Sequence, residues 1–343
     1  MSSWRTSGLA TALAAGLGLV TVLAVNAPAN AAALADENGP DNSDWGTVVE
    51  TSVTGVQADS WVVRVQGLQG ILDTALFESA FPTRANAPEE QAGGKNLVDL
   101  APGGFGLGKV SALYSRALGN KVPATASGGT TTPAPGVAYA DAGGASVDIG
   151  IPYVQNPTGG TQLSPLGVHV EGISVSAMSA PGQPVKFTGG AARAYLSSLG
   201  GRLIDIPPLW PVNFGARIPG DYSRPPVALA TTNEQVTTDN KGMPTLGADK
   251  HYKYDAKATS GYVNGIHASV LGTEVADVTV AHAAVIRDPL LTDKFKDKLP
   301  KLPDAKDFVK PVADKLDKLK EAAGTVKPAA DAVKPAAPAM PQG

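Results

Sequence analysis

The sequence contains no cysteine, which excludes disulfide bonds, thiolate metal sites, a cysteine nucleophile and a lipid anchor on cysteine. It is also poor in charge, since charged residues make up 17% of the 343 residues, against about a quarter in ordinary domains. The net charge of −3 argues against nucleic acid as a partner. Because 43% of the residues are hydrophobic, a folded core is nevertheless expected.

Long hydrophobic runs are absent after the first 35 residues, so the mature protein is predicted to span no membrane. Residues 1–35 themselves read as a secretory signal peptide, with Arg5 followed by an apolar run from Leu9 to Val25 and small-residue cleavage patterns. An N-terminal membrane anchor is the alternative. We expect a secreted protein that is extracellular or associated with the cell wall. No C-terminal sorting signal is recognised, which leaves the mode of attachment open.

Charge is distributed unevenly, and this suggests the domain plan. Residues 36–287 carry a net charge of −6, whereas residues 288–343 carry +2 and contain 20 charged side chains. We therefore predict a signal peptide at 1–35, a β-rich extracellular domain at 36–287, an amphipathic helical segment at 288–324 and a disordered Pro/Ala/Lys tail at 325–343.

The body alternates apolar and polar residues with a period of two, which is typical of strands. Nine strand-like runs are bounded by Gly, Pro, Asn and Asp: Thr47–Val53, Trp61–Gln66, Ser146–Tyr153, Val168–Met178, Pro184–Thr188, Arg202–Ile206, Val227–Thr232, Gly261–Leu271 and Ala276–Ile286. This pattern predicts an all-β fold, a β-sandwich or jelly-roll-like body with long loops, with a barrel as the alternative. Helix is weakly supported, and its best candidates are Gln69–Phe81 and Ala192–Leu199.

Two long stretches do not resemble strands. Residues Asn120–Gly136 are rich in Gly, Thr, Pro and Ala, and they are interpreted as a surface loop or as a boundary that divides the body into two domains. Residues Leu209–Pro226 hold several prolines and aromatics and are interpreted as an ordered loop. The turn Asp239–Gly242 is predicted to close a hairpin, because Asn and Gly tolerate positive φ.

The search for a metal site centres on the histidines. His267 and His282 lie on two predicted neighbouring strands, with Glu274 and Asp277 between them, so antiparallel pairing could bring them together. A metal needs two or three such side chains converging on one point. Half-buried histidines bonded to backbone or water are the preferred interpretation, so no metal ligand and no cofactor site is predicted.

No signature of catalysis is recognised either, so the chain is predicted not to be an enzyme. The sequence has no G-x-S-x-G nucleophile motif, and the G-x-G near Gly103 lacks the context of a phosphate-binding loop. No pair of carboxylates stands out by spacing among Glu171, Asp205, Asp239, Asp255, Glu274 and Asp277. Tyr252, Tyr254 and Tyr262 could stack on sugar rings, although packing within the fold is the preferred interpretation.

The segment Thr231–Arg287 resembles exported actinobacterial surface proteins of the "choice-of-anchor" family. The residues that carry this resemblance are the turn D-N-K-G-M-P-T-L, the segment Y-K-Y-D and the strand pair G-Y-V-N-G-I-H and A-D-V-T-V-A-H. The resemblance implies a β-rich extracellular domain with no established catalysis, and it brings no functional residues with it.

The tail differs in kind from the body. Phe308, Val312, Leu316, Leu319 and Ala323 form one apolar stripe of a predicted helix, and Leu291–Leu299 could form a shorter amphipathic turn. This tail could lie on a membrane surface, associate with a second helix, including that of another copy, or place its lysines against anionic wall polymers.

The sequence therefore favours a non-enzymatic secreted protein with a structural or adhesive role at the cell surface or in the extracellular matrix. Its expected partners are wall or matrix polymers or other surface proteins. Two alternatives remain open: an extracellular hydrolase acting on polysaccharide or ester, and a carbohydrate- or metal-binding module.

Overall fold

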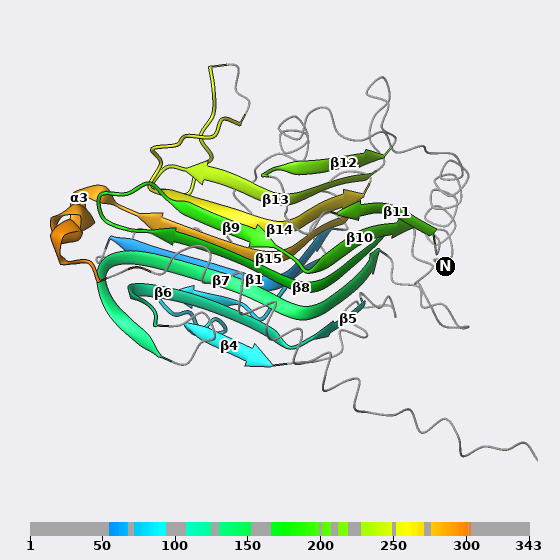
Figure 1. The fold of residues 1–343 in the computed structure, drawn as a ribbon, viewed down its shortest axis with the longest axis horizontal. Helices are drawn as coiled ribbons and strands as arrows, with labels where there is room; N and C mark the ends of the chain where they lie inside the picture. Colours follow the sequence, from blue (N-terminus) through cyan, green and yellow to red (C-terminus); the bar gives the residue numbers. More distant parts are fainter. Residues whose placement is uncertain are drawn as a thin grey trace, which may run out of the picture.

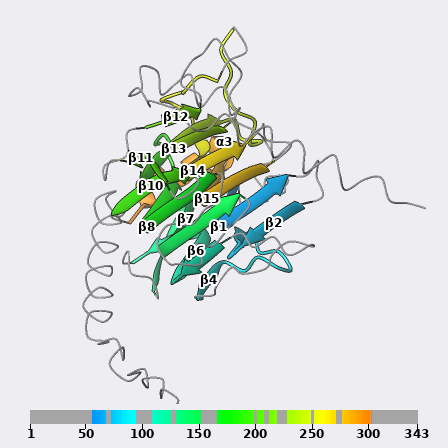
Figure 2. The ribbon, with the colours of Figure 1, turned by 90° about the vertical axis from the view of Figure 1, so that its right-hand side faces the viewer.

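The structure is a computed structural model built from two antiparallel β-sheets, which confirms the predicted all-β sandwich. It describes residues 55–67, 72–93, 108–124, 130–151, 166–198, 201–206, 212–218, 228–248, 252–270, 276–300 and 302. In Figure 1 the strands run from side to side. Figure 2 views the sandwich from one end, so that the two layers are seen side by side.

One sheet has seven strands and the other has eight. In spatial order, the seven-stranded sheet contains β12 (Phe214–Ile218), β13 (Ala228–Thr238), β14 (Ser260–Val270), β15 (Ala276–Arg287), β1 (Val56–Gly67) and β2 (Leu72–Leu76), with β3 (Ser79–Phe81) also paired to β1. The eight-stranded sheet contains β11 (Gly201–Ile206), β10 (Arg193–Ser198), β8 (Leu166–Ser179), β7 (Thr131–Ile151), β6 (Leu113–Pro123) and β4 (Glu90–Gly93), with β5 (Gly108–Ser111) on β7 and β9 (Lys186–Gly190) on β8.

The chain begins and ends in the same sheet. Strands β1 to β3 belong to the seven-stranded sheet, β4 to β11 build the other sheet, and β12 to β15 return to the first. As a result the first strand lies beside the last one, with Val56 opposite Arg287 and Gly67 opposite Ala276. Both described ends of the body, at residues 55 and 287, therefore lie at one end of the sandwich, which we call the junction end.

The interpretation of Asn120–Gly136 as a loop is wrong at both of its ends. These ends lie in the paired strands β6 and β7, where Lys121 faces Pro133 and Pro123 faces Thr131, whereas residues 125–129 lie outside the described residues. Prolines are tolerated here because the register shifts next to them and the ladder is irregular. The two strands pack against β1 of the opposite sheet, so the sequence on both sides of this segment builds one sandwich.

Both weak helix predictions in the body are also wrong. Within Gln69–Phe81 the chain forms β2 and β3, which pair with β1, and within Ala192–Leu199 it forms β10 between β8 and β11. In β10 the buried core residues Ala194 and Leu196 alternate with outward-facing residues, which is a period of two. Strand pairing thus outweighs the helix propensity of Ala and Leu. Residues Leu209–Pro226 likewise include strand β12 rather than only loop.

The core between the sheets consists almost entirely of Val, Ala, Ile and Leu, and the few large rings reach it from its margin. Phe81 is one of them, and its ring lies where a side chain on β6 would otherwise be. A Cβ on Gly119 would come within 1.9 Å of this ring, so only glycine leaves room for it.

After β15 the chain forms α3 (Pro289–Thr292) and the 3₁₀ helix η2 (Asp293–Lys298), which agrees with the amphipathic turn predicted for Leu291–Leu299. Leu299 and Leu302 then pack against a cluster on the outer face of the eight-stranded sheet that includes Leu118 and Met178. Within the described part of the chain, no helical segment has both the length and the apolar character to cross a bilayer. The predicted signal peptide, the strand Thr47–Val53, the helix Phe308–Ala323 and the tail 325–343 lie outside the described residues.

Candidate functional site

An irregular row crosses four neighbouring strands of the seven-stranded sheet. It consists of Val62, Asn233, Gly265 and Ala281, at which the regular ladder pairing is interrupted on β1, β13, β14 and β15. Asn233 and Ala281 have positive φ angles of 48° and 55°. On β15 both Ala281 and Val280 face the core, so the alternation of side chains shifts by one residue at this row.

The shift places outer-face residues from both sides of the row next to one another. His267 and Glu234 pair with different partners along the ladder, yet His267 Nδ1 lies 2.8 Å from Glu234 Oε2. His267 Nε2 lies 3.0 Å from Asp277 Oδ2, and Asn264 Nδ2 donates to Glu234 Oε2 over 2.8 Å. His282 Nδ1 lies 2.6 Å from Asn264 Oδ1. We call these five residues the buried network.

His267 is held between two carboxylates and is 2% exposed. Burial lowers the pKa of His267, but the charges of Glu234 and Asp277 and their hydrogen bonds outweigh it, so the pKa lies well above its usual value. Both ring nitrogens then donate, and His267 is an imidazolium. The buried network therefore contains one cation between two anions.

His282 is the opposite case. Burial, followed by the charges of Arg64 and His267, holds the pKa of His282 well below its usual value. Because Asn264 uses its amide nitrogen for Glu234, its oxygen accepts a hydrogen bond, and the proton of neutral His282 therefore sits on Nδ1. The His282 ring stacks on Trp61 at a centroid distance of 3.6 Å, and the Arg64 guanidinium lies 5.2 Å from the centre of the Trp61 ring.

The antiparallel pairing of β14 and β15 agrees with the sequence prediction, but the two histidines do not converge on one point. His267 lies opposite Thr279 and His282 opposite Asn264, and Glu234 and Asn264 connect the two rings. Among the described residues no group of three or more His, Asp and Glu is arranged to hold a metal ion. Glu274 lies outside the described residues.

A second polar cluster lies on the outer face of the eight-stranded sheet. His169 Nε2 lies 2.7 Å from Ser197 Oγ on β10, and His169 Nδ1 lies 2.9 Å from Asp148 Oδ1 on β7. The ring of Tyr195 stacks on His169 at 4.3 Å. The hydrogen-bond order Ser–His–Asp is that of a hydrolase triad. Sequence analysis missed Asp148 and Ser197, because only the register of the three strands brings them together.

Exposure distinguishes this cluster from a working triad. A nucleophile must be open to substrate while its aspartate is buried behind the histidine. Here Ser197 is fully buried, and Asp148 keeps a side-chain exposure of 33%. The cluster thus connects β7, β8 and β10 across their outer face and presents its carboxylate, rather than its hydroxyl, to the surroundings.

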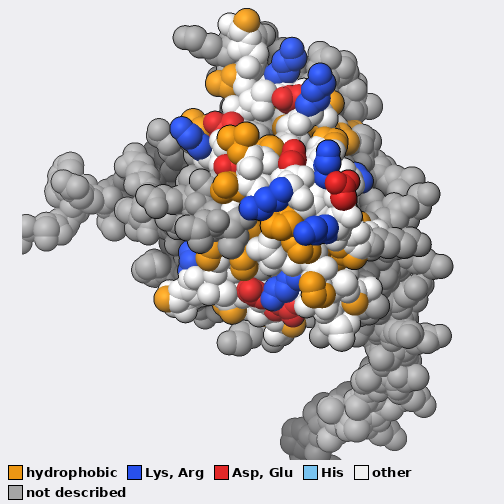
Figure 3. All heavy atoms as spheres, turned by 90° about the vertical axis from the view of Figure 1, so that its left-hand side faces the viewer, with side chains coloured by type: hydrophobic (Ala, Val, Ile, Leu, Met, Phe, Trp, Pro, Cys, Tyr) orange, Lys and Arg blue, Asp and Glu red, His pale blue; other side chains and the backbone are white. Residues whose placement is uncertain are grey.

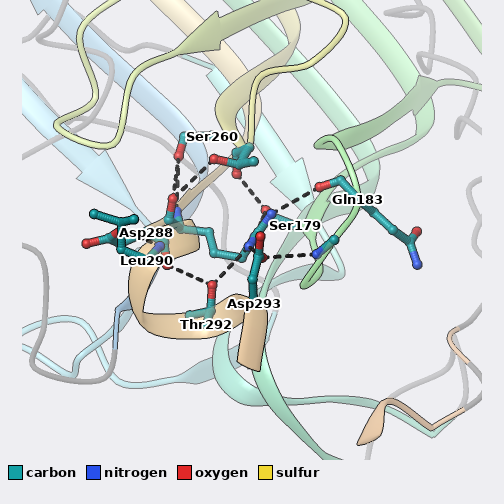
Figure 4. A network of polar contacts seen from close by, with 10 residues as sticks. Ser179, Gln183, Ser260, Asp288, Leu290, Thr292 and Asp293 are labelled. Carbon is teal, nitrogen blue, oxygen red and sulfur yellow. Dashed lines mark hydrogen bonds and ion pairs between the residues drawn. The ribbon is translucent and has the colours of Figure 1, made fainter. Parts of the chain in front are cut away.

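A third cluster surrounds Arg287 at the junction end, and Figure 4 labels its partners Ser179, Gln183, Thr292 and Asp293. The guanidinium of Arg287 is almost fully buried and donates to Ser179 Oγ over 2.9 Å, to the Gln183 carbonyl over 3.1 Å and to Thr292 Oγ1 over 2.9 Å. It also forms an ion pair of 2.5 Å with Asp293. Burial raises the pKa of Asp293, but the amide of Gly182 and the charge of Arg287 outweigh this effect and lower it.

The backbone around Arg287 is also fixed. The Asp288 amide donates to the Gly55 carbonyl over 2.8 Å, which links the two described ends of the body. The Arg287 amide donates to Ser260 Oγ over 3.0 Å, and Thr259 Oγ1 donates to the Arg287 carbonyl over 3.2 Å. One residue therefore connects β8, β14 and α3 at the point where the tail begins.

The tyrosines named by sequence analysis do not form a sugar-binding platform. Tyr262 is fully buried, and the hydroxyl of half-buried Tyr252 donates to the Gln235 carbonyl and accepts from the Thr237 amide. Only Tyr254, at 45%, is well exposed among the three. The predicted turn at Asp239–Gly242 is present, with Gly242 at a φ of 79°.

No protein-family model, no curated protein and no solved structure matches this chain.

Proposed function

We propose that this chain is a non-enzymatic secreted protein with a structural or adhesive role at the cell surface or in the extracellular matrix. The observation that best supports this proposal is the position of the body's two ends. Both lie at the junction end, where Asp288 is bonded to Gly55 and Arg287 anchors the first turns of the tail. A body attached through its tail would thus present its opposite end to partners.

The buried clusters support a structural rather than a catalytic role. Glu234 and His267 are buried, and Ser197 is closed to substrate. Each cluster connects at least two strands or elements through buried side chains, as expected of a cysteine-free exported fold that relies on its sheets for stability.

The test is cell fractionation into medium, wall and membrane, with the chain intact and with residues 303–343 removed. The cut is placed after Leu302 because Leu302 packs against the body, and because Thr292 and Asp293 are bonded to Arg287. We expect the intact protein with the cells and a larger share of the truncated one in the medium. Equal distribution of both, together with unchanged morphology and adhesion in a strain that lacks the protein, would contradict the proposal.

The enzymatic alternative is a hydrolase of ester bonds, and one observation favours it: the hydrogen-bond order Ser197–His169–Asp148. A fluorophosphonate probe decides between the two functions. Covalent labelling of the native protein that is abolished by Ser197→Ala would establish the hydrolase, and absence of labelling in the native protein supports the structural role.

A further inference from the structure

The junction end carries exposed hydrophobic side chains on two separate segments. Leu290 and Leu291 on α3 are 92% and 40% exposed, and Met243, Leu246 and Tyr254 in the connection between β13 and β14 are 48%, 56% and 45% exposed. Figure 1 shows both segments at the same end of the sandwich. Hydrophobic side chains exposed together are characteristic of interaction surfaces.

The same end is rich in lysine. The described residues 179–186, 239–248, 252–259 and 287–300 contain eight basic and five acidic side chains, a net charge of +3, although residues 36–287 as a whole carry −6. Six of the lysines are exposed and form no ion pair with any described residue: Lys241, Lys253, Lys257, Lys294, Lys296 and Lys298. Figure 3 looks onto this end and shows Lys and Arg side chains among hydrophobic ones, with fewer acidic groups.

Most of the carboxylates at this end bond to the protein itself. Asp239 Oδ1 accepts the backbone amides of Lys241 and Met243, each over 2.8 Å. Asp255, Asp288 and Asp293 each accept a backbone amide in the same way. The carboxylates therefore stabilise turns and helix starts, while the six exposed lysines form no ion pair with a described residue, and the ammonium of Lys294 lies 5.2 Å from the centre of the Phe295 ring.

We infer that the junction end docks on an anionic lipid surface, with the lysines at the phosphate groups and the exposed hydrophobic side chains in the interfacial layer. This combination of basic and hydrophobic side chains is the one that binds such surfaces, because each charge and each buried CH₂ group contributes. The acidic remainder of the body is repelled by the same surface, which orients the sandwich with its opposite end outward. The inference rests on the proposed function and names the surface that this end contacts.

The experiment is sedimentation of the purified protein with vesicles of phosphatidylglycerol or of phosphatidylcholine. We expect binding to phosphatidylglycerol vesicles, weakening as salt is added, and little binding to phosphatidylcholine. A single Lys294→Gln change should reduce the partition coefficient about fivefold, since one lysine near an anionic surface contributes about 1 kcal/mol. Leu290→Asn should also reduce it, because Leu290 is the most exposed hydrophobic side chain of this end.

Matched controls are available elsewhere in the chain. Lys109 is exposed on β5, where Gly108 pairs with Ile149 at the opposite end of the sandwich. Val212, which lies just before β12, is 49% exposed. Lys109→Gln and Val212→Asn should change the partition coefficient less than twofold. All four substituted side chains are exposed, so folding is expected to be unaffected.

Equal affinity for the two lipids, no binding to either, or an equal effect of Lys109→Gln and Lys294→Gln would overturn the inference. Retention on soluble polyglycerol phosphate without binding to vesicles would also overturn it, since the partner would then be a polymer. If the protein fractionates with the cells but does not bind vesicles, this inference alone is refuted. A protein that binds vesicles but stays in the medium refutes the proposed function.

Discussion

The Arg287 cluster and the buried network both bury charge, but the first connects separate elements and the second connects neighbouring strands of one sheet. Arg287 bonds to side chains and carbonyls from separate elements, among them Ser179, Gln183 and Thr292. The buried network lies within a single sheet, where Glu234 and His267 bond across adjacent strands that the ladder already holds. We therefore expect the first cluster to hold elements together and the second mainly to set how stability depends on pH.

Replacing Arg287 by Met should have the largest effect. It removes four side-chain hydrogen bonds and leaves buried partners such as Ser179 and Thr292 without a donor, so we expect the free energy of unfolding to fall by about 3–5 kcal/mol. Denaturant unfolding followed by circular dichroism measures the change. Lys296→Met is the control, because Lys296 is an exposed residue of the neighbouring 3₁₀ helix η2, and the change should stay within about 0.5 kcal/mol. A loss below about 1 kcal/mol for Arg287→Met would contradict the comparison.

Glu234→Gln should have the second-largest effect. We expect it to lower the free energy of unfolding by about 2–4 kcal/mol near neutral pH, because it leaves the His267 imidazolium with one carboxylate in place of two. The folded-state pKa of His267 is raised, so its stabilisation is complete below the unfolded pKa of about 6.5 and is lost as pH rises through the folded value. The difference between wild type and variant should therefore shrink at alkaline pH. A difference that does not change with pH would show that His267 is neutral throughout this range.

His282→Gln should have a smaller effect with the opposite pH dependence. The folded-state pKa of His282 is lowered, so the wild type loses stability as pH falls below about 6.5, where the unfolded chain binds the proton. Glutamine cannot take up that proton, so the advantage of the wild type should decrease from pH 8 to pH 5. Denaturant unfolding of both proteins across this pH range measures the difference in stability. For His267→Gln the advantage of the wild type should instead increase from pH 8 to pH 5.

Asp148→Asn should have the smallest effect, about 1 kcal/mol or less. Asp148 is one-third exposed, so its bond to His169 is screened by solvent, and the strands it connects are already paired. Thermal unfolding is a sufficient measurement. A loss as large as that of Glu234→Gln would mean that this cluster stabilises its sheet as much as the buried network does.

The strands could be predicted from the sequence to the extent that alternation was regular. Trp61–Gln66 and Ala276–Ile286 are rich in Val, and both are strands of the seven-stranded sheet, although their alternation shifts at Val62 and Ala281. The prolines and glycines of Asn120–Gly136 resemble a loop in the sequence, whereas pairing between β6 and β7 determines the conformation of its two ends.

The polar clusters could be predicted less well. A polar residue within an apolar strand, such as Asn264 between Val263 and Gly265, is a local signal of the buried network. The meeting of His267 with Glu234 depends on the shifted row at Gly265, and that of Asp148 with Ser197 depends on the register of three strands. Neither can be derived from spacing along the chain.

The adjacency of β1 and β15 gives the body a direction-dependent resistance to force. A pull applied between Val56 and Arg287, which face each other at the junction end, would open the β1–β15 ladder one hydrogen-bonded pair at a time. A pull between residue 287 and the far end of the sandwich would load β15 in shear against both β1 and β14, so that all its ladder bonds would have to break together. A body tethered through its C-terminal tail and gripped at its far end is therefore loaded along its mechanically strongest axis.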